Sequence, residues 1–392
     1  MTSKTYCPLP YMHQYIGSTG YPTPCCHVFE EEWSSWTIAD YEKGLKTGMY
    51  DVMRKQMKEG HWPSICKKCK LQEERGTTSH RQLALERFGY TEEIKIKYLD
   101  IAYSNKCNLA CRMCKPSDSD QLEELYKDQT EFPSWIANGW AKVKEDESLR
   151  KVEWTKKLVR EGLELWKVTG GEPTACKYFM GLLDWIIDNN YAAGLEIQLT
   201  TNGTKFNKPL IEKLLKFKKV KLLLSIDGTG KVYDYIRHNA SWTKTYSNLK
   251  LLTEYPTIDL MVALVASFYN TTNIADLVHQ CAKLNIPVYT DQDLKPETSE
   301  ISPYNTDSNI RNILNSQASQ IEKEYPTDKL VDHHARQSAK SLRNIAKAKP
   351  VGSKVKKRLL NTLQLQDRLY NTNYMNFLQK EQIEYLEGKY NE

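Results

Sequence analysis

The sequence of 392 residues contains no apolar run that approaches the roughly 18 residues a membrane-spanning helix requires. Its first residues, MTSKTYCPLPYMHQ, lack the apolar core of a signal peptide. The charge is only mildly unbalanced, with 55 Lys and Arg against 49 Asp and Glu, and this excess does not by itself indicate a nucleic-acid binder. We therefore expect a cytoplasmic globular protein with no membrane partner and no nucleic-acid partner.

What the sequence does contain is ten cysteines, most of them clustered at positions 7, 25, 26, 66, 69, 107, 111 and 114. In a reducing compartment such clusters indicate metal binding and not disulfides. The apolar fraction of 40% is enough for a hydrophobic core, and the length allows one large domain or two ordinary ones. We expect an oxygen-sensitive metalloprotein.

Three of these cysteines, Cys107, Cys111 and Cys114, have the spacing C-x3-C-x2-C and follow a short apolar alternation at 94–102 that predicts a strand. Three thiolates on so tight a loop can hold three irons of a [4Fe-4S] cube and leave the fourth iron open. An open iron can bind a small molecule and pass it an electron. Structural zinc, the alternative, prefers four ligands that usually come as two separated pairs.

A second motif lies downstream, where an apolar strand ends at Val168 and is followed by the segment Thr169 to Pro173, TGGEP. Together with the cysteine loop, it resembles the radical S-adenosylmethionine (SAM) superfamily over residues 94–292. The resemblance implies that Gly170, Gly171 and Glu172 contact the amino group of SAM. Glycine suits this role because its backbone can approach a ligand closely.

The same resemblance implies further contacts to SAM. Asn202 and Ser225 are candidates for its ribose or carboxylate, and the guanidinium of Arg237 suits a carboxylate. A surface ion pair is the alternative role for Arg237. Met113 stands where the family often has an aromatic residue, and its polarizable sulfur can pack on the adenine.

Strands alternate with helical stretches through the middle of the chain, and this alternation predicts an α/β fold with a parallel sheet. We expect a partial (β/α)6 TIM-type barrel, the radical SAM core, at 93–299, with a helical C-terminal region at 300–392. Active sites of such barrels gather at the carboxyl ends of the strands. The expected strands are 94–102, 163–168, 195–203, 220–228, 258–267 and 286–291.

Residues 1–92 predict a small cysteine-rich domain with little regular structure of its own. The spacing C-x12-G-x4-C from Cys7 to Cys25, followed by the pair Cys66 and Cys69, resembles the SPASM and twitch extensions of radical SAM enzymes. This resemblance implies one auxiliary [4Fe-4S] cluster with these four ligands. The alternative is a structural zinc bound by the same thiolates.

Other polar residues of this region have less definite roles. Cys26 is a fifth thiol that neither the auxiliary cluster nor a structural zinc ion requires. Any of four scattered histidines could replace a thiolate as ligand. Residues 70–89 predict a helix broken near Gly76, with Arg75 and Arg81 exposed. Outside this region, Cys176 and Cys281 are expected to be buried core thiols.

These observations predict a radical SAM enzyme that reductively cleaves SAM to a 5′-deoxyadenosyl radical, which abstracts hydrogen from a substrate. The resemblance to SPASM and twitch enzymes implies a peptide or protein side chain as substrate, with a sugar or nucleotide derivative as the alternative. A flavodoxin- or ferredoxin-type protein is the expected electron donor. A non-catalytic iron-sulfur protein would require neither the intact GGEP segment nor the uninterrupted cysteine loop.

Overall fold

The computed structural model of the protein describes residues 4–28, 42, 45, 48–74, 78–137, 140, 145–293, 300–348 and 352–388. The chain divides into two compact units. The first comprises Met1–Asn105, Lys142–Leu199 and Lys213–Lys219, and the second comprises Lys106–Ala141, Thr200–Glu212 and Val220–Glu392. Among the described helices, none combines the length and the apolar character needed to cross a bilayer.

The first unit is built on strands in the order β2-β1-β3-β4-β5. β1, β3, β4 and β5 are parallel, whereas β2 pairs with β1 in the antiparallel sense. The last two residues of β5 belong to the second unit. The strands span His13–Ile16 (β1), Pro22–Thr23 (β2), Tyr98–Ala102 (β3), Leu165–Thr169 (β4) and Glu196–Thr201 (β5).

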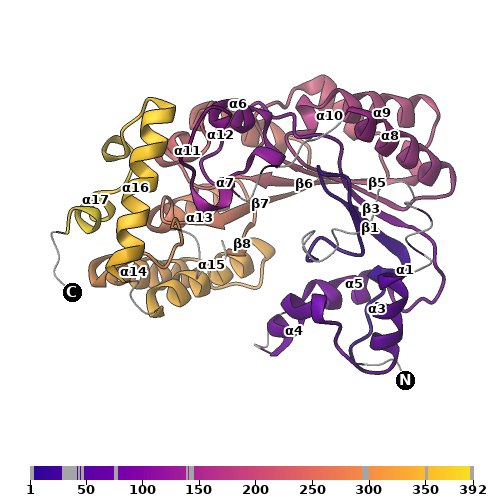
Figure 1. The fold of residues 1–392 in the computed structure, drawn as a ribbon, viewed down its shortest axis with the longest axis horizontal. Helices are drawn as coiled ribbons and strands as arrows, with labels where there is room; N and C mark the ends of the chain where they lie inside the picture. The colour runs from indigo at the N-terminus through magenta and orange to yellow at the C-terminus, as the bar shows by residue number, and fades with distance from the viewer. Residues whose placement is uncertain are drawn as a thin grey trace. The chain divides into compact units, whose positions relative to one another are not determined.

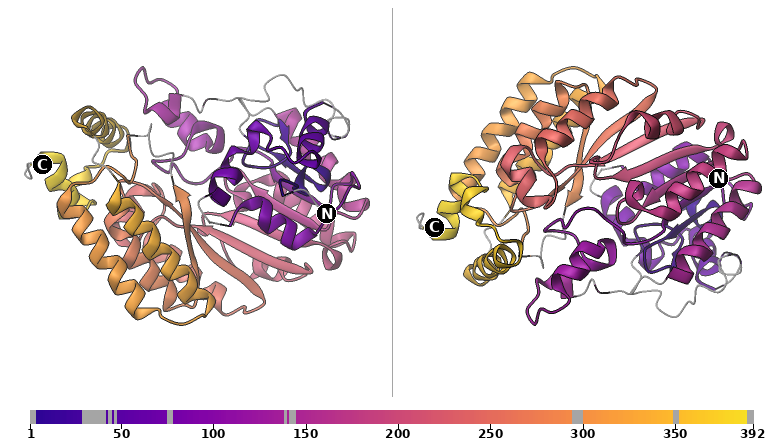
Figure 2. Two further views of the ribbon diagram at one scale, coloured as in Figure 1. Left: turned by 90° about the horizontal axis from the view of Figure 1, so that it is seen from below. Right: turned by 90° about the horizontal axis from the view of Figure 1, so that it is seen from above.

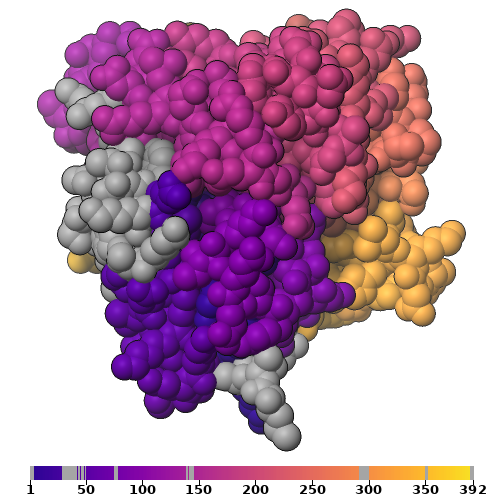
Figure 3. Space-filling model, turned by 90° about the vertical axis from the view of Figure 1, so that its right-hand side faces the viewer, coloured from indigo at the N-terminus to yellow at the C-terminus, as the bar shows by residue number. Residues whose placement is uncertain are grey.

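Helices cover both faces of these strands (Figure 1). On one face lie α8 (Glu145–Arg160) and α9 (Lys177–Asp188), and on the other lie α1 (Leu9–Met12), α3 (Met49–Lys58), α4 (Lys67–Glu74) and α5 (His80–Phe88). Figure 3 shows the outer surface of this unit, with the purple N-terminal helices below the magenta α8 and α9. Short 3-10 turns span Ser64–Cys66 (η3), Pro173–Ala175 (η5) and Ala192–Gly194 (η6).

The two faces differ in chemistry because successive strand residues point to opposite sides. Toward α9, Trp166 of β4 packs against Phe179, with ring centroids 5.4 Å apart. On the opposite face, Lys167 of β4 donates to the buried Asp100 of β3 at 2.7 Å. The face that meets the N-terminal helices is therefore polar at its centre.

The second unit contains the parallel strands β6 (Lys219–Ser225), β7 (Ile258–Ala266) and β8 (Val288–Asp293), in that order. It begins with the cysteine loop and a helical insertion. The helices and 3-10 turns up to β8 are η4 (Pro116–Asp118), α6 (Asp120–Tyr126), α7 (Ser134–Ala137), α10 (Lys208–Leu214), α11 (Gly230–Ile236), α12 (Trp242–Thr253), η7 (Thr271–Asn273) and α13 (Ile274–Ala282). α10 begins in this unit and ends in the first.

The C-terminal region is helical. α14 and α15 form a hairpin whose second helix packs along β8, and α16 follows it (Figure 2). The elements are α14 (Ser308–Glu324), α15 (Leu330–Lys347), α16 (Ser353–Tyr370), η8 (Tyr374–Asn376) and α17 (Lys380–Glu387). The predicted α/β fold with parallel strands is thus confirmed, and each of the six expected strands has a counterpart in β3 to β8.

Two predictions for the N-terminal region are wrong. It has regular structure, including β1, which extends the parallel sheet beside β3. Arg81 is buried, with 7% of its surface exposed, because it pairs with Glu73 at 2.6 Å and donates to the Tyr6 carbonyl. Arg75 and Gly76 lie outside the described residues. Cys176 and Cys281 are buried, as expected.

Candidate active site and cysteine cavity

The three-cysteine loop, residues 107–114, opens the second unit. Its backbone is fixed by hydrogen bonds to the end of α11, from Ala110 N to His238 O (3.2 Å) and from Arg112 N to Ile236 O (2.9 Å). The amide of Cys107 donates to Asp120 at the start of α6, at 2.8 Å. None of the three cysteines is in a disulfide, and Cys111 is buried while the other two are half-buried. The loop therefore holds its thiols on a rigid frame.

An ion pair lies beside the loop. Arg237 donates to Asp227 at 2.7 Å, and its Nη1 lies 3.8 Å from the sulfur of Cys111. Although burial disfavours its charged form, Asp227 holds the pKa of Arg237 above its usual range. Burial raises the pKa of the Cys111 thiol, and the charge of Arg237 opposes that rise. The ion pair thus places a permanent positive charge against the second cysteine of the loop.

A second arginine anchors the loop from within. Arg112 is fully buried between the rings of Tyr235 and Tyr370, with its guanidinium carbon 3.8 Å and 4.3 Å from their centroids. It donates to Thr372 at 2.6 Å and lies 3.5 Å from the carboxylate of Asp367. Cation–π contacts in a buried setting are worth about 2 kcal/mol. This anchor ties the cysteine loop to the end of α16.

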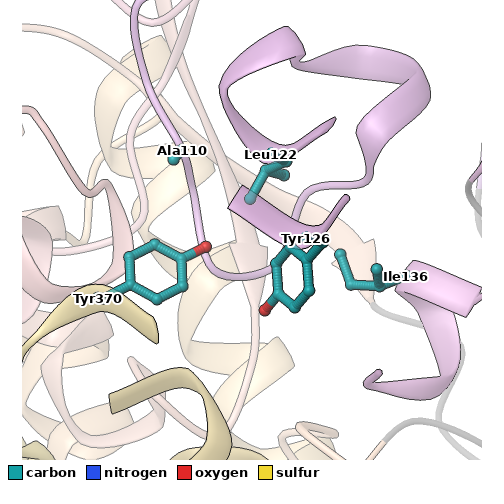
Figure 4. Close-up of a cluster of buried hydrophobic side chains, with 5 residues drawn as sticks. All are labelled: Ala110, Leu122, Tyr126, Ile136 and Tyr370. Carbon is teal, nitrogen blue, oxygen red and sulfur yellow. The ribbon is translucent and has the colours of Figure 1, made fainter. Parts of the chain in front are cut away.

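The apolar support of the loop comes from the helical insertion (Figure 4). Tyr126, Leu122 and Ile136 are buried and gather with Tyr370 around the loop that carries Ala110. Loss of water-accessible apolar surface stabilises such a cluster by about 25 cal/mol per Å². The insertion therefore supports the cysteine loop from the side of α6 and α7.

Of the other predicted SAM contacts, Asn202 and Arg237 reach the cysteine loop within the second unit. Asn202 donates to the side chain of Asn108 at 3.0 Å and accepts from Thr204 at 2.6 Å. Ser225 ends β6 and is half-buried, as is Met113 within the loop. Asn202 thus links the end of β5 to the residue that follows Cys107.

The GGE segment belongs to the first unit. Gly170 has a φ of +105°, and a Cβ at this position would lie 2.8 Å from that of Ala102, so only glycine fits without displacement. Glu172 is buried and accepts from the hydroxyl of Thr174 at 2.7 Å and from its amide at 3.1 Å. These bonds fix the carboxylate at the start of η5.

The N-terminal cysteines form a second constellation, also in the first unit. Cys7, Cys25, Cys66 and Cys69 line one cavity between α1, β2, η3 and α4, here named the four-thiol cavity. All four are free. Burial raises the pKa of each thiol, to about 12 for Cys66. Four neighbouring thiols in a buried cavity are a donor set that fits a [4Fe-4S] cluster or a tetrahedral zinc ion.

Residues 101–269 match the family model of the Radical SAM superfamily. This part of the chain is a radical SAM domain. Domains of this superfamily use a [4Fe-4S] cluster and SAM, and the three thiols of the loop are a donor set that fits such a cluster.

Two curated relatives of the radical SAM domain are GTP 3′,8-cyclases. The one from Peptoclostridium acidaminophilum is 27% identical over 220 residues, which cover 55% of this chain and 58% of that enzyme. The one from Campylobacter fetus subsp. fetus (strain 82-40) is 30% identical over 108 residues, which cover 28% of each chain. This chain therefore spans 58% or less of the length of these relatives.

Similar solved structures include anSMEcpe with bound AdoMet, with a TM-score of 0.40, 16% identity and coverage of 58% of this chain and 60% of that one. Streptococcus suis SuiB bound to precursor peptide SuiA has a TM-score of 0.39 and 15% identity, with coverage of 68% of this chain and 61% of that one.

Sequence reasoning missed residues that hold the radical SAM domain together. Asp227 lies two residues after the end of β6, at the strand end where functional side chains gather, so its position in the sequence was a usable signal. Arg112 gave no such signal, because its partners Tyr370, Thr372 and Asp367 lie far along the chain.

Proposed function

We propose that this protein is an enzyme that reductively cleaves SAM at a [4Fe-4S] cluster bound by Cys107, Cys111 and Cys114. The observation that carries the proposal is the rigid loop of three thiols that form no disulfide, beside the Arg237–Asp227 ion pair, within a radical SAM domain. When bound, the cluster supplies the electron that cleaves SAM to methionine and a 5′-deoxyadenosyl radical, which takes hydrogen from a substrate C–H bond.

The residues of the chain have separate roles in this proposal. Gly170 and Gly171 let the backbone approach SAM, and the buried Glu172 accepts from its amino group. Arg237 supplies positive charge beside Cys111, which lowers the electrostatic cost of a buried thiolate. Asn202 and Ser225 offer polar groups to the ribose or carboxylate, and Met113 packs on the adenine.

The N-terminal region, in this proposal, holds an auxiliary [4Fe-4S] cluster. Support comes from the four thiols that line one cavity and from their C-x12-G-x4-C and C-x2-C spacing. An auxiliary cluster can bind substrate or carry away the second electron of an oxidation. Reduced flavodoxin or ferredoxin would donate the first electron. The ten free cysteines favour a reducing compartment, the cytoplasm.

For the substrate we propose a peptide or protein side chain. The support is the N-terminal cysteine spacing, which resembles that of SPASM and twitch enzymes. A nucleotide derivative is the second candidate, favoured by the 27% identity to a GTP 3′,8-cyclase. Both candidates require the same radical chemistry, so they differ only in the hydrogen donor.

The experiment uses anaerobically reconstituted protein with dithionite and SAM. We expect release of 5′-deoxyadenosine, and none from the triple variant Cys107→Ala, Cys111→Ala, Cys114→Ala. Cys281→Ala, which removes a buried thiol of α13, is the matched control and should keep full activity. Release by the triple variant would overturn the proposal.

A second arm identifies the substrate class. Deuterium that appears in 5′-deoxyadenosine from a deuterated peptide pool supports the first candidate. Deuterium that comes only from deuterated GTP supports the second. Both arms depend on SAM cleavage, which the first experiment tests by itself.

A further inference from the structure

A cluster of three potential ligands lies beside the four-thiol cavity. Cys26 and His27 follow β2, and His80 is the first residue of α5. One ligand atom from each lies within 4.8 Å of the other two. The imidazole rings of His27 and His80 have centroids 5.0 Å apart. Residues from two distant segments therefore bring one sulfur and two ring nitrogens together.

The local fold holds these side chains in place. Ser79 and Gln82 form a capping box that fixes the first turn of α5 and with it His80. The amide of His27 donates to the sulfur of Cys25 at 3.4 Å, which constrains the Cys25-Cys26-His27 turn. His27 and His80 also line the four-thiol cavity, and the Nδ1 of His27 lies 3.9 Å from the sulfur of Cys69, whereas Cys26 is not among the described residues that line it.

Two buried polar atoms at or near the cluster are unsatisfied. Within the described part of the chain, the Nδ1 of His80 and the Oδ1 of Asp100 are buried and have no hydrogen-bond partner. A buried polar atom left unpaired costs about 1–3 kcal/mol. Asp100 also influences both Cys26 and His80 electrostatically, so its carboxylate lies near the cluster. A cation held by this cluster would satisfy the Nδ1 of His80.

The nearby positive charges do not prevent cation binding. Lys167 is neutralised by Asp100, to which it donates at 2.7 Å. Lys68 is exposed, so water screens its charge.

We propose that Cys26, His27 and His80 form a binding site for one zinc ion at the edge of the four-thiol cavity, which both histidines line. A thiolate with two imidazoles is a mixed ligand set that favours zinc, whereas a [4Fe-4S] cluster prefers thiolates alone. Zinc–ligand bonds of about 2.0–2.3 Å place tetrahedral ligands about 3.5 Å apart, so the side chains need only close by about 1 Å. Water completes the coordination.

The site joins the turn after β2 to the start of α5. Small cysteine-rich regions are often stabilised by a bound metal because their hydrophobic core is small. Zinc here would fix Cys25 on one side and α5 on the other, and so stabilise one wall of the four-thiol cavity.

The test uses full-length, iron-reconstituted protein that is stripped with a chelator and then titrated with Zn²⁺ alone. We expect about one zinc per chain beyond the iron. Cys26→Ser and His80→Gln should each weaken zinc binding by more than the roughly 10- to 100-fold that loss of an outer-shell partner costs, with iron unchanged. His61→Gln, a change at an exposed histidine of the same region, is the control.

Two further measurements test whether a loss of zinc binding comes from misfolding of the variant and whether zinc binds at these three residues. Cys26→Asp keeps an anionic ligand and should recover part of the affinity that Cys26→Ser loses. Zinc K-edge X-ray absorption should show one sulfur and two nitrogen ligands. Four sulfur ligands, no retained zinc, or zinc binding that Cys66→Ala and Cys69→Ala abolish while Cys26→Ser does not would overturn the proposal.

Discussion

The two cysteine sets of this protein are assembled in different ways. The three-cysteine loop is local: its thiols lie within eight consecutive residues, and its backbone bonds to the end of α11. The four-thiol cavity takes Cys7 from before α1, Cys25 from after β2, and Cys66 and Cys69 from η3 and α4 of the first unit. A local loop holds its shape by itself, whereas the cavity exists only when the N-terminal region is folded.

The difference in thiol number has a chemical consequence. Three thiolates leave one iron of a cube open to a ligand such as SAM, and four thiolates close it. Each site has a largely buried arginine paired with a carboxylate, Arg237 with Asp227 at the loop and Arg81 with Glu73 at the cavity. In our proposal the number of thiols therefore gives the SAM chemistry to the loop and an auxiliary cluster to the cavity.

The largest expected effect concerns iron content. Reconstituted protein should carry about eight irons, and Cys66→Ala with Cys69→Ala should reduce this to about four. The same change should expose residues 1–92 to proteolysis, because the cavity depends on its ligands. Four irons plus a zinc with four sulfur ligands in the unmutated protein would instead assign the cavity to structural zinc. Cys26→Ala should keep all eight irons.

The next largest effect is on the free energy of unfolding when either of the buried arginines Arg112 and Arg81 is replaced. Arg112→Met should lower the free energy of unfolding by about 3 kcal/mol, because it leaves Asp367 buried without its cation. Arg81→Met should cost less, about 2 kcal/mol, since the side chain of Glu73 is 17% exposed. Urea unfolding followed by circular dichroism measures both. An equal or reversed order would contradict the stronger anchoring of the loop.

A change at Glu172 should affect SAM binding without affecting either set of cysteine ligands. Glu172→Ala removes a charge-assisted hydrogen bond worth about 1.5–3 kcal/mol, so the Kd of SAM should rise about 10- to 100-fold. Iron content should stay unchanged, because Glu172 is not an iron ligand. Isothermal titration of reconstituted protein measures the affinity. Glu172→Gln keeps the side-chain shape, and unaltered SAM binding in both variants would contradict the role of this residue.

The smallest effect is a pH dependence of the N-terminal region. Burial works against the charge of Glu73, but hydrogen bonds from Arg81 and Ser79 outweigh it and hold the pKa of Glu73 below its usual 4.5. A lowered folded-state pKa contributes stability above about pH 4.5, and this contribution is lost as the pH falls through the folded value. The thermal unfolding midpoint should therefore fall on acidification below pH 4.5. Glu73→Gln should reduce that slope, and an unchanged slope would contradict the pairing.

Much of the fold followed from local patterns in the sequence. The alternation of apolar residues predicted β3 to β8, since buried parallel strands leave a clear signal. It missed β1, in which His13 and Gln14 are polar yet buried, because pairing with β3 determines that strand. Arg81 was expected on the surface because charge alone does not reveal a partner such as Glu73.

In the candidate site, too, local features could be predicted from the sequence and long-range contacts could not. The spacing of Cys107, Cys111 and Cys114 identified the loop, because thiol ligands to one cluster must be close in space. The Arg112 anchor could not be predicted, since its partner Asp367 lies in a helix near the other end of the chain. The spacing of neighbouring ligands can be recognised in the sequence, whereas a polar pair between distant residues can be found only in the folded structure.

The central claim, that the three-cysteine loop and not the four-thiol cavity binds SAM, has a direct spectroscopic test. Electron-nuclear double resonance of the reduced protein with SAM labelled by ¹⁵N in the amino group reports whether that nitrogen is coupled to a cluster. We predict the coupling in the unmutated protein and in the Cys66→Ala, Cys69→Ala variant, and its loss when Cys107, Cys111 and Cys114 become Ala. A coupling that survives in the triple variant but disappears in the double variant would contradict the account.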